Sequence, residues 1–290
     1  MIIVILTVFF FTSICNGDNN FPRYEHANLS AYIENIYLCG LDTKIGTGSS
    51  FFYKYNKYIF LVTAGHIFYR SNKLNGQIVY QLINPDTTLV SWQFKENQQI
   101  QLNKFYIDLK IIDSVRQIIH DKENDIAIIF FGIYKDSSKT FFTGMGVKSK
   151  NKTGGNMYWI DSTSSKSYDE VYIGQSIYIY GYPSDLSYGD NSQFELENGF
   201  YRSGIVSAKN KVDRNIILDC QVHGGNSGCP VFADLKNTEG NYQFYSLGMI
   251  IEKIRDKKTN ENSGYSVAIP MDKIEELIKN EFITRIPESE

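Results

Sequence analysis

The sequence predicts an all-β protein that ends in one helix, and three observations support this fold class. Tyr and Phe number 21 and 19 among the 290 residues, and β-branched residues are frequent beside them, which suits the half-buried surfaces of sheets. Short apolar and aromatic runs alternate with polar turns, a pattern typical of strands. Helical periodicity is scarce until the end of the chain, so we expect an all-β body closed by a single helix.

The expected elements follow in chain order. Strands are predicted at 49–53, 58–64, 125–131, 176–182, 216–219 and 245–251. A helix is predicted over 271–282, just after Pro270, because Ile274, Leu277, Ile278 and Phe282 recur at helical spacing. The polar stretches 84–103 and 135–170 are interpreted as insertions or long loops; in the first, Trp92 and Phe94 alternate as in an extra hairpin.

Composition excludes several protein classes. Charged residues make up 21% and hydrophobic residues 42% of the chain, which is a globular balance and excludes general disorder. Six prolines and 22 glycines without a repeating period exclude a collagen-like chain. A net charge of −3 favours neither nucleic acid nor an anionic membrane surface, so no nucleic-acid partner is expected.

The N-terminus resembles a secretory signal peptide. The first fourteen residues carry no charged side chain, and small residues follow at Cys15 and Gly17. The alternative, a membrane anchor, is disfavoured because spanning a bilayer takes about 20 apolar residues. We therefore expect cleavage after Gly17 and a secreted protein (periplasmic in a Gram-negative bacterium) with no stable membrane span. Asn28 and Asn151 begin glycosylation acceptor sequences if the host is eukaryotic.

Cysteine usage argues against a disulfide-built scaffold. Cleavage at that point leaves Cys39, Cys220 and Cys229, and an odd count allows at most one internal disulfide. Their spacing does not make a zinc site, so no metal is expected. The favoured interpretation is that they are buried and pack as small apolar residues.

Two residues at strand ends could work together. Among four histidines (His26, His66, His120 and His223), His66 ends the apolar run 60–66, where rigid backbone presents an imidazole. Asp125 begins a buried strand, so its carboxylate needs a donor partner, and an imidazole N–H is one candidate. Asp113 and Asp121 are competing candidates.

A third element is the segment 224–230, Gly-Gly-Asn-Ser-Gly-Cys-Pro. Glycines on both sides of Ser227 permit a tight turn with neighbouring backbone N–H groups that point the same way. Such a turn supplies an exposed hydroxyl and donors for an oxyanion beside it.

Together, Thr-Ala-Gly-His (63–66), Asp-Ile-Ala (125–127) and Gly-Asn-Ser-Gly-Cys-Pro (225–230), in the order His, Asp, Ser, resemble the chymotrypsin-fold (trypsin-like) serine peptidases. Segments 203–208 and 181–183 point to the HtrA peptidase-domain and glutamyl endopeptidase branches, and 46–49 fits the start of the fold's second strand. The resemblance implies two six-stranded antiparallel β-barrels and a C-terminal helix. The expected organisation is a signal peptide (1–17), an N-terminal segment (18–29), a peptidase domain (30–285, its barrels split at about 135–170) and a tail (286–290).

The resemblance also implies roles for individual residues. His66, Asp125 and Ser227 would be the catalytic triad, and the N–H groups of Gly225 and Ser227 the oxyanion hole. The reaction would be endopeptidase hydrolysis of peptides or proteins through an acyl-enzyme, by a monomer without a cofactor. The specificity pocket would be built from these residues: Gln221, Val222, His223, Ile250, Lys253, Gly264 and Ser266.

Departures from the family refine these expectations. Asn226 replaces the Asp that pairs with a newly cut N-terminus in the animal digestive branch, so that zymogen switch is expected to be absent. Ile250 and Val222 stand where glutamate-reading residues would be, which favours a small or apolar substrate side chain. The remaining alternatives are a catalytically silent peptidase-fold binding protein and a structural β-protein with accidental motifs.

Overall fold

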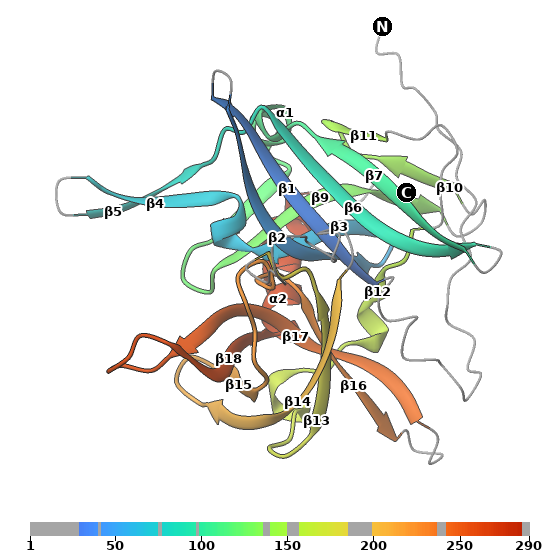
Figure 1. Ribbon diagram of the computed structural model, residues 1–290. Coiled ribbons are helices and arrows are strands. Elements are labelled where there is room, and N and C mark those ends of the chain that lie inside the picture. Colours follow the sequence, from blue (N-terminus) through green and yellow to red (C-terminus); the bar gives the residue numbers. More distant parts are fainter. Residues whose placement is uncertain are drawn as a thin grey trace, which may run out of the picture.

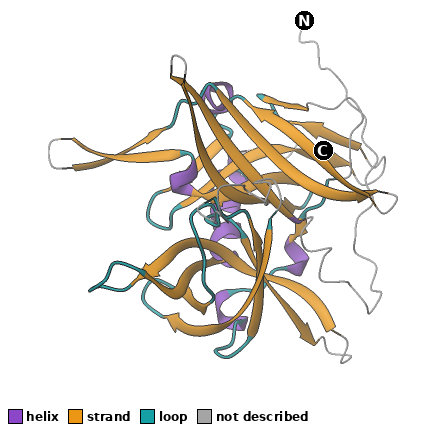
Figure 2. Ribbon diagram, in the orientation of Figure 1, coloured by secondary structure: helices purple, strands orange, loops and turns teal. Residues whose placement is uncertain are grey.

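Two β units lie one above the other in the computed structural model, with a helix packed between them (Figures 1 and 2). The structure describes residues 29–39, 42–74, 77–96, 99–135, 140–149, 157–184, 199–236 and 242–285. The predicted class is confirmed: the chain is mainly strand, two antiparallel β units follow one another as in a chymotrypsin-like double barrel, and a helix follows the last strand.

The N-terminal unit is a ten-stranded sheet that curls on itself. Its path runs β10-β9-β3-β2-β1-β6-β7-β11, with β8 added beside β9 and β12 beside β2. The pairs are antiparallel except β12 with β2. The structure therefore has a half-barrel of ten strands where the resemblance implies a barrel of six. The strands are β1 (Ser30–Cys39), β2 (Asp42–Tyr55), β3 (Tyr58–Ala64), β6 (Thr87–Glu96), β7 (Gln99–Ile107), β8 (Ile118–Asp121), β9 (Ile126–Lys135), β10 (Thr140–Thr143), β11 (Val147–Ser149) and β12 (Ile160–Asp161).

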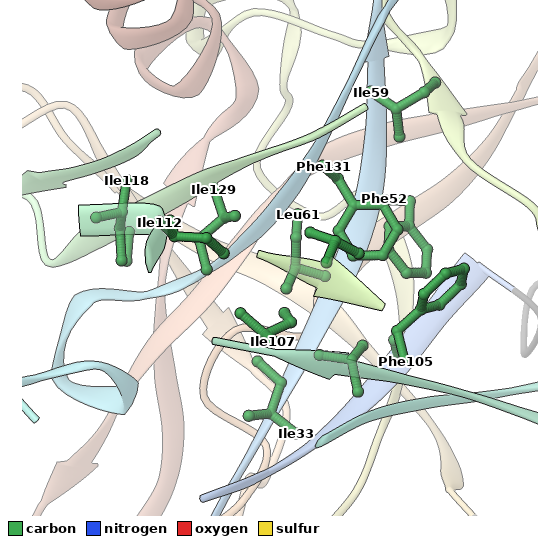
Figure 3. Close-up of a cluster of buried hydrophobic side chains, with 14 of the residues drawn as sticks. Ile33, Phe52, Ile59, Leu61, Phe105, Ile107, Ile112, Ile118, Ile129 and Phe131 are labelled. Atoms are coloured by element: carbon green, nitrogen blue, oxygen red, sulfur yellow. The ribbon is translucent and has the colours of Figure 1, made fainter. Parts of the chain in front are cut away.

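A cluster of buried side chains fills the concave side of this sheet (Figure 3). Alternate residues of each strand reach it because side chains on a strand point to opposite faces. Ile59 and Leu61 of β3 belong to this cluster, whereas Phe60 and Val62, which alternate with them, pack toward the C-terminal unit. Strand β3, which leads to His66, is thus buried on both faces. Its packing on both sides fixes the position of the strand end where His66 follows.

The two polar stretches belong to the sheet. The stretch 84–103 contains β6 and the start of β7, and Trp92 is buried in the core against Phe52 and Phe105. The stretch 135–170 carries β10, β11 and β12, which pair with β9, β7 and β2. The hairpin expected from the alternation of Trp92 and Phe94 is confirmed, because β6 and β7 pair with each other, and both strands are part of the sheet. The interpretation as a long loop is wrong for β10, β11 and β12, because such short strands need few apolar residues of their own.

The C-terminal unit is a closed barrel of six strands in the order β13-β14-β15-β18-β17-β16. Its interior is lined by small aliphatic residues such as Ile179, Leu218 and Ala268. Closure leaves no free edge over most of the barrel. The strands are β13 (Ser176–Gly181), β14 (Phe200–Asn210), β15 (Asn215–Asp219), β16 (Pro230–Lys236), β17 (Tyr242–Arg255) and β18 (Asn262–Pro270).

Helix α2 (Met271–Glu281) confirms the predicted C-terminal helix and packs between the units (Figure 1). Its Ile274 and Ile278 are fully buried in a cluster with β3, β9, β16 and β17. Sequence reasoning missed the short helix α1 (Leu109–Ser114), which Asp108 caps by accepting a hydrogen bond from Ile111 N. The remaining helical turns are η2 (Gly65–Ile67), η3 (Ser162–Ser164), η4 (Tyr168–Glu170) and η5 (Ile283–Arg285).

Polar contacts of α2 reach both units. The hydroxyl of Tyr53 in β2 donates to Glu275 at 2.6 Å, and Arg214 in the β14–β15 turn pairs with Asp272 at 2.9 Å. The Lys273 ammonium donates to Asn124 of the N-terminal unit and to the Asp213 carbonyl of the barrel, both at 2.5 Å. The helix therefore acts as a clamp between the two units.

Three cysteines lie in the described part of the chain, and all three are free thiols there. Cys220 and Cys229 are buried, as expected, and burial raises the pKa of Cys220 to about 11. Cys39 is exposed, so the expectation of burial is wrong for it.

Several predictions fall outside the described residues: the signal peptide, most of the segment 18–29, both glycosylation sites and the tail 286–290. Among the described residues, no helix has the length and apolar character needed to cross a bilayer.

Candidate active site

His66 sits where β3 turns into the short helical segment η2. Its side chain is 48% exposed, whereas Ala64 and Gly65 before it and Ile67 after it are buried. A Cβ atom at position 65 would come within 2.8 Å of both Asp125 Oδ1 and His120 Nε2, so glycine is needed for this close approach. The end of a buried strand thereby presents one imidazole to solvent.

Asp125 holds His66 from the neighbouring strand. Its Oδ2 lies 2.6 Å from His66 Nδ1, and its Oδ1 accepts a hydrogen bond from the His66 backbone N–H at 2.8 Å. The Asp125 carbonyl also accepts from Gly65 N at 2.7 Å. With Nδ1 engaged by a carboxylate, His66 is oriented through three contacts and Nε2 is left for other chemistry.

The backbone of Asp125 is left-handed, with φ of +53° just before β9 begins. Asp tolerates this conformation better than most residues. The competing candidate Asp121 is engaged elsewhere, since its carboxylate accepts from the backbone N–H groups of Glu123 and Asn124 and from the Asn124 amide. Asp113 is exposed on α1. The structure thus brings Asp125, and neither competitor, into hydrogen-bond contact with His66.

The loop that carries Ser227 consists of two successive turns. Asn226 N donates to His223 O at 3.1 Å, and Cys229 N donates to Asn226 O at 3.0 Å. The third residue of each turn is a glycine in the left-handed region, Gly225 at +89° and Gly228 at +91°. A side chain at either position would also collide with backbone atoms, so the loop can be built only with these two glycines.

Ser49 of β2 fastens this loop to the N-terminal unit. Its backbone N–H donates to Ser227 O at 2.9 Å, and its hydroxyl donates to Gly225 O at 2.7 Å. The same hydroxyl accepts from Tyr182 N at 3.0 Å, and the Ser49 carbonyl accepts from the Thr63 hydroxyl at 2.7 Å. Sequence reasoning missed this positioning role, although the small residues at 46–49 were a signal for it.

Two backbone donors in the loop have no acceptor among the groups that the structure describes. Within the described residues, neither Gly225 N nor Ser227 N donates a hydrogen bond to the protein. These are the two N–H groups predicted for the oxyanion hole, and their chemistry suits an anion formed beside Ser227. Beneath them, the Asn226 side chain is fully buried, and its amide has no partner among the described groups.

A pocket of about 900 Å³ brings the predicted triad together. Ser227 lines it with His66 and Asp125, although no hydrogen bond joins Ser227 to His66 in the described part of the chain. Catalytic contacts of this kind are often long until substrate binds. The walls come from the turn before β9, the β14–β15 turn, β17 and α2; they comprise Glu123, Asn124, Val212, Asp213, Arg214, Asn215, Ile251, Glu252, Lys253, Arg255 and Lys273.

The residues predicted for the specificity pocket are spread over several environments. Lys253 lines the same pocket as the triad. Val222 and Ile250 belong to the barrel core, and Ser266 is buried with its hydroxyl donated to Cys220 O at 3.1 Å. The other three lie toward the surface: Gln221 is exposed, whereas His223 and Gly264 are half-buried.

His120 of β8 is a neighbour of the site that sequence reasoning left unassigned. Its ring stacks on Tyr69 with 4.0 Å between centroids and meets the edge of Tyr80 at 5.2 Å. Burial lowers the pKa of His120, against the opposing pull of the Asp125 and Asp121 carboxylates. The ring therefore favours the neutral form beside the His66–Asp125 pair.

Among known proteins, solved structures resemble this chain in overall fold. No family model and no curated protein matches the chain. A solved structure of the HtrA-type protease AlgW with a decapeptide is similar, with a TM-score of 0.46 and 15% identity. The match covers 89% of this chain and 64% of that one, so this chain spans less than two thirds of its length. The likeness singles out no branch of the chymotrypsin-fold peptidases.

Proposed function

We propose that the chain is a secreted serine endopeptidase that hydrolyses peptide bonds through an acyl-enzyme. One observation carries the proposal: a histidine oriented by a carboxylate at 2.6 Å shares a pocket with a serine on a glycine-built turn. A nucleophile, a base and an orienting acid placed in this way are the elements of nucleophilic acyl transfer.

Each group has a distinct role in the proposed reaction. Ser227 Oγ attacks the carbonyl carbon of the scissile bond, and His66 takes the hydroxyl proton and returns it to the leaving amine. Asp125 keeps the imidazole in the required orientation and stabilises its cationic form. The N–H groups of Gly225 and Ser227 bind the developing oxyanion, and removal of one such donor costs about 3 kcal/mol. Water then releases the acyl group from Ser227 by the reverse sequence.

The proposed substrates are proteins or peptides. The backbone of β17 offers an edge at the pocket, where Ile251 and Glu252 line it together with Lys253. An extended peptide can pair with such an edge while its side chains enter the pocket. A library of peptides that differ in the residue before the scissile bond would test the expected preference for a small or apolar side chain; a strong preference for Glu would contradict it.

The experiment that tests the function is covalent labelling with a fluorophosphonate probe. We expect the folded wild-type chain to be labelled, and Ser227→Ala and the heat-denatured chain to remain unlabelled. Labelling that persists in Ser227→Ala would place the reactive group elsewhere. A folded wild-type chain that is neither labelled nor active on any unfolded protein would contradict the proposal.

A catalytically silent binding protein is the second candidate function. The observation that favours it is the missing hydrogen bond between Ser227 and His66 among the described residues. The two candidates differ in a direct measurement. A silent protein would bind unfolded polypeptides equally well as wild type and as Ser227→Ala, and would release no cleaved product with either.

A further inference from the structure

A two-stranded hairpin projects from the molecule beside the candidate site. Strands β4 (Tyr69–Leu74) and β5 (Gln77–Leu82) form a sheet of their own that follows directly after His66 and η2. In Figure 1 the hairpin extends away from both β units. A two-stranded hairpin on its own is only marginally stable in water. A hairpin that projects from the protein in this way therefore suggests a binding role.

One face of this hairpin is continuous with the site. Residues opposite one another in an antiparallel pair lie on the same face of the sheet. We call the face made by the following pairs the hairpin face: Tyr69 with Leu82, Ser71 with Tyr80, and Lys73 with Ile78. At its base, Tyr69 and Tyr80 pack against the His120 ring. Because His120 lies beside Gly65, the hairpin face runs outward from the turn that carries His66.

The outer part of this face is apolar and positively charged. Ile78 is 63% exposed and Tyr80 is 40% exposed. Lys73 is also exposed, and Arg70 on the other face adds a second cation, whereas neither strand contains an Asp or Glu. The whole chain is net negative, so the hairpin is a local basic site on an acidic protein.

The hairpin also has open backbone edges. In the described part of the chain, β4 and β5 pair only with each other, so each strand has a row of free N–H and C=O groups on its outer side. Such edges accept an additional strand, and the alternating side chains of that strand then contact one face. An extended polypeptide with apolar and acidic side chains would satisfy both the edges and the hairpin face.

We propose that the hairpin face binds an extended, acidic and apolar segment of the polypeptide substrate, outside the residues that fill the catalytic pocket. An apolar side chain of that segment contacts Ile78 and Tyr80, and a carboxylate lies beside Lys73. The inference rests on the proposed peptidase function, because the substrate is the chain that must pass the adjacent His66. It makes the hairpin a selector of long, unfolded, acidic substrates.

The test uses the double variant Lys73→Glu/Ile78→Ser and a matched control, Lys44→Glu/Ile45→Ser. The control makes the same chemical changes at exposed positions of the β1–β2 hairpin, where Ile45 is 51% exposed. The substrates are a tetrapeptide amide, reduced carboxymethylated α-lactalbumin as an acidic unfolded protein, and reduced lysozyme capped with iodoacetamide, which adds no charge, as a basic one.

We expect kcat/KM for the acidic unfolded protein to fall about tenfold in the hairpin variant, and to stay within twofold for the tetrapeptide. The control variant should match wild type on every substrate. If kcat/KM for the tetrapeptide fell as much as for the acidic protein, the hairpin would only support the catalytic site. If kcat/KM for the acidic protein did not change, the hairpin would bind no substrate. Either result would overturn the proposal. It would also be overturned if sedimentation showed that wild type is a dimer and the hairpin variant a monomer, because the hairpin face would then bind a second copy of the chain.

A binding measurement separates this inference from the proposed function. Fluorescence anisotropy of labelled carboxymethylated α-lactalbumin is measured with Ser227→Ala and with the same variant carrying Lys73→Glu/Ile78→Ser. About tenfold weaker binding in the second protein supports the hairpin face even if no cleavage is ever found. Equal binding contradicts the hairpin face even if the chain is an active peptidase.

Discussion

In the N-terminal sheet, His66 and Asp125 are fixed by hydrogen bonds to each other, whereas the serine loop of the C-terminal barrel is also held by hydrogen bonds from the opposite unit. The His66–Asp125 contacts at 2.6 and 2.8 Å join two neighbouring strands of one sheet. Ser227 and Gly225 instead accept hydrogen bonds from Ser49, across the boundary between the units. One half of the candidate site is therefore local to its unit, and the other half depends on how the units dock.

This difference separates two kinds of perturbation. A change within the His66–Asp125 pair alters the chemistry and leaves the docking of the units intact. A change at Ser49 or in helix α2 alters docking first and chemistry as a consequence. Replacements of the two kinds should therefore differ in how strongly they change activity and stability.

Replacement of Asp125 by Asn should lower kcat/KM by about 10⁴-fold, because Asn stabilises neither the required tautomer nor the cationic form of His66. Peptide hydrolysis measures the loss, and a melting temperature close to that of wild type shows that docking is unaffected. Asp113→Asn, an exposed change on α1, is the control and should retain full activity. Retention of more than a tenth of wild-type activity by Asp125→Asn would remove Asp125 from the site.

Replacement of Ser49 by Ala should lower kcat/KM by roughly 10- to 100-fold, because Gly225 O loses its donor and only the hydrogen bond from Ser49 N to Ser227 O still joins the serine loop to β2. Stability should fall by about 1–3 kcal/mol, since buried polar groups are left unpaired. Ser50→Ala is the matched control: its buried hydroxyl donates to Ala31 O at 3.2 Å within the N-terminal sheet. It should cost stability without a comparable loss of activity, and equal activity losses would contradict the specific role of Ser49.

Replacement of Lys273 by Met should destabilise the protein by about 2 kcal/mol, because Asn124 and the Asp213 carbonyl lose a charged donor. Activity should fall severalfold, since Asn124 precedes Asp125 and lines the pocket. Chemical denaturation and peptide hydrolysis give the two values. Lys279→Met on the same helix removes the ion pair of a half-exposed lysine with Glu275 at 3.4 Å and its contact with the Tyr55 ring, and it should cost less than about 1 kcal/mol. The idea of a clamp fails if the two variants behave alike.

The smallest effect concerns Glu170, which precedes the barrel. A hydrogen bond from Lys166, aided by the Ser167 backbone N–H, lowers the pKa of Glu170 to about 2. Because the folded pKa lies below the ordinary value of 4.5, this stabilisation is complete above about pH 5 and is lost as pH falls toward 2. Solvent screening limits it to less than about 1 kcal/mol. Wild type should therefore exceed Glu170→Gln in stability at pH 7 and equal it near pH 2; a constant difference would contradict the assigned cause.

The sequence predicted those elements whose formation depends on neighbouring residues in the chain. The strand at 58–64 and the helix at 271–282 have periodic apolar residues and clear boundaries, and both appear as expected within one residue. The glycines around Ser227 predict a tight turn, because few other residues adopt positive φ. The pairing of Asp125 with His66, rather than Asp113 or Asp121, came from the family pattern, and the structure agrees with it.

Features that depend on contacts between distant segments were not predictable. The short strands in 135–170 form because of the partners they pair with, so their own composition resembles that of loops. In 84–103 the alternation of Trp92 and Phe94 did indicate the hairpin of β6 and β7, but not its place beside β1. The role of Ser49 depends on a loop 176 residues away in sequence. Val222 and Ile250 were placed in the specificity pocket by analogy, whereas the barrel closure puts their side chains in its core.

Helix α2 is synthesised after both β units, which affects when the two units can be joined. A ribosome makes both β units before it makes residues 271–281, so the clamp is the last of these three parts to exist. Until then, no helix joins the turn before Asp125 to the barrel that carries Ser227. Under the proposed function, a site completed only when this helix docks would protect the unfolded nascent chain from cleavage by itself.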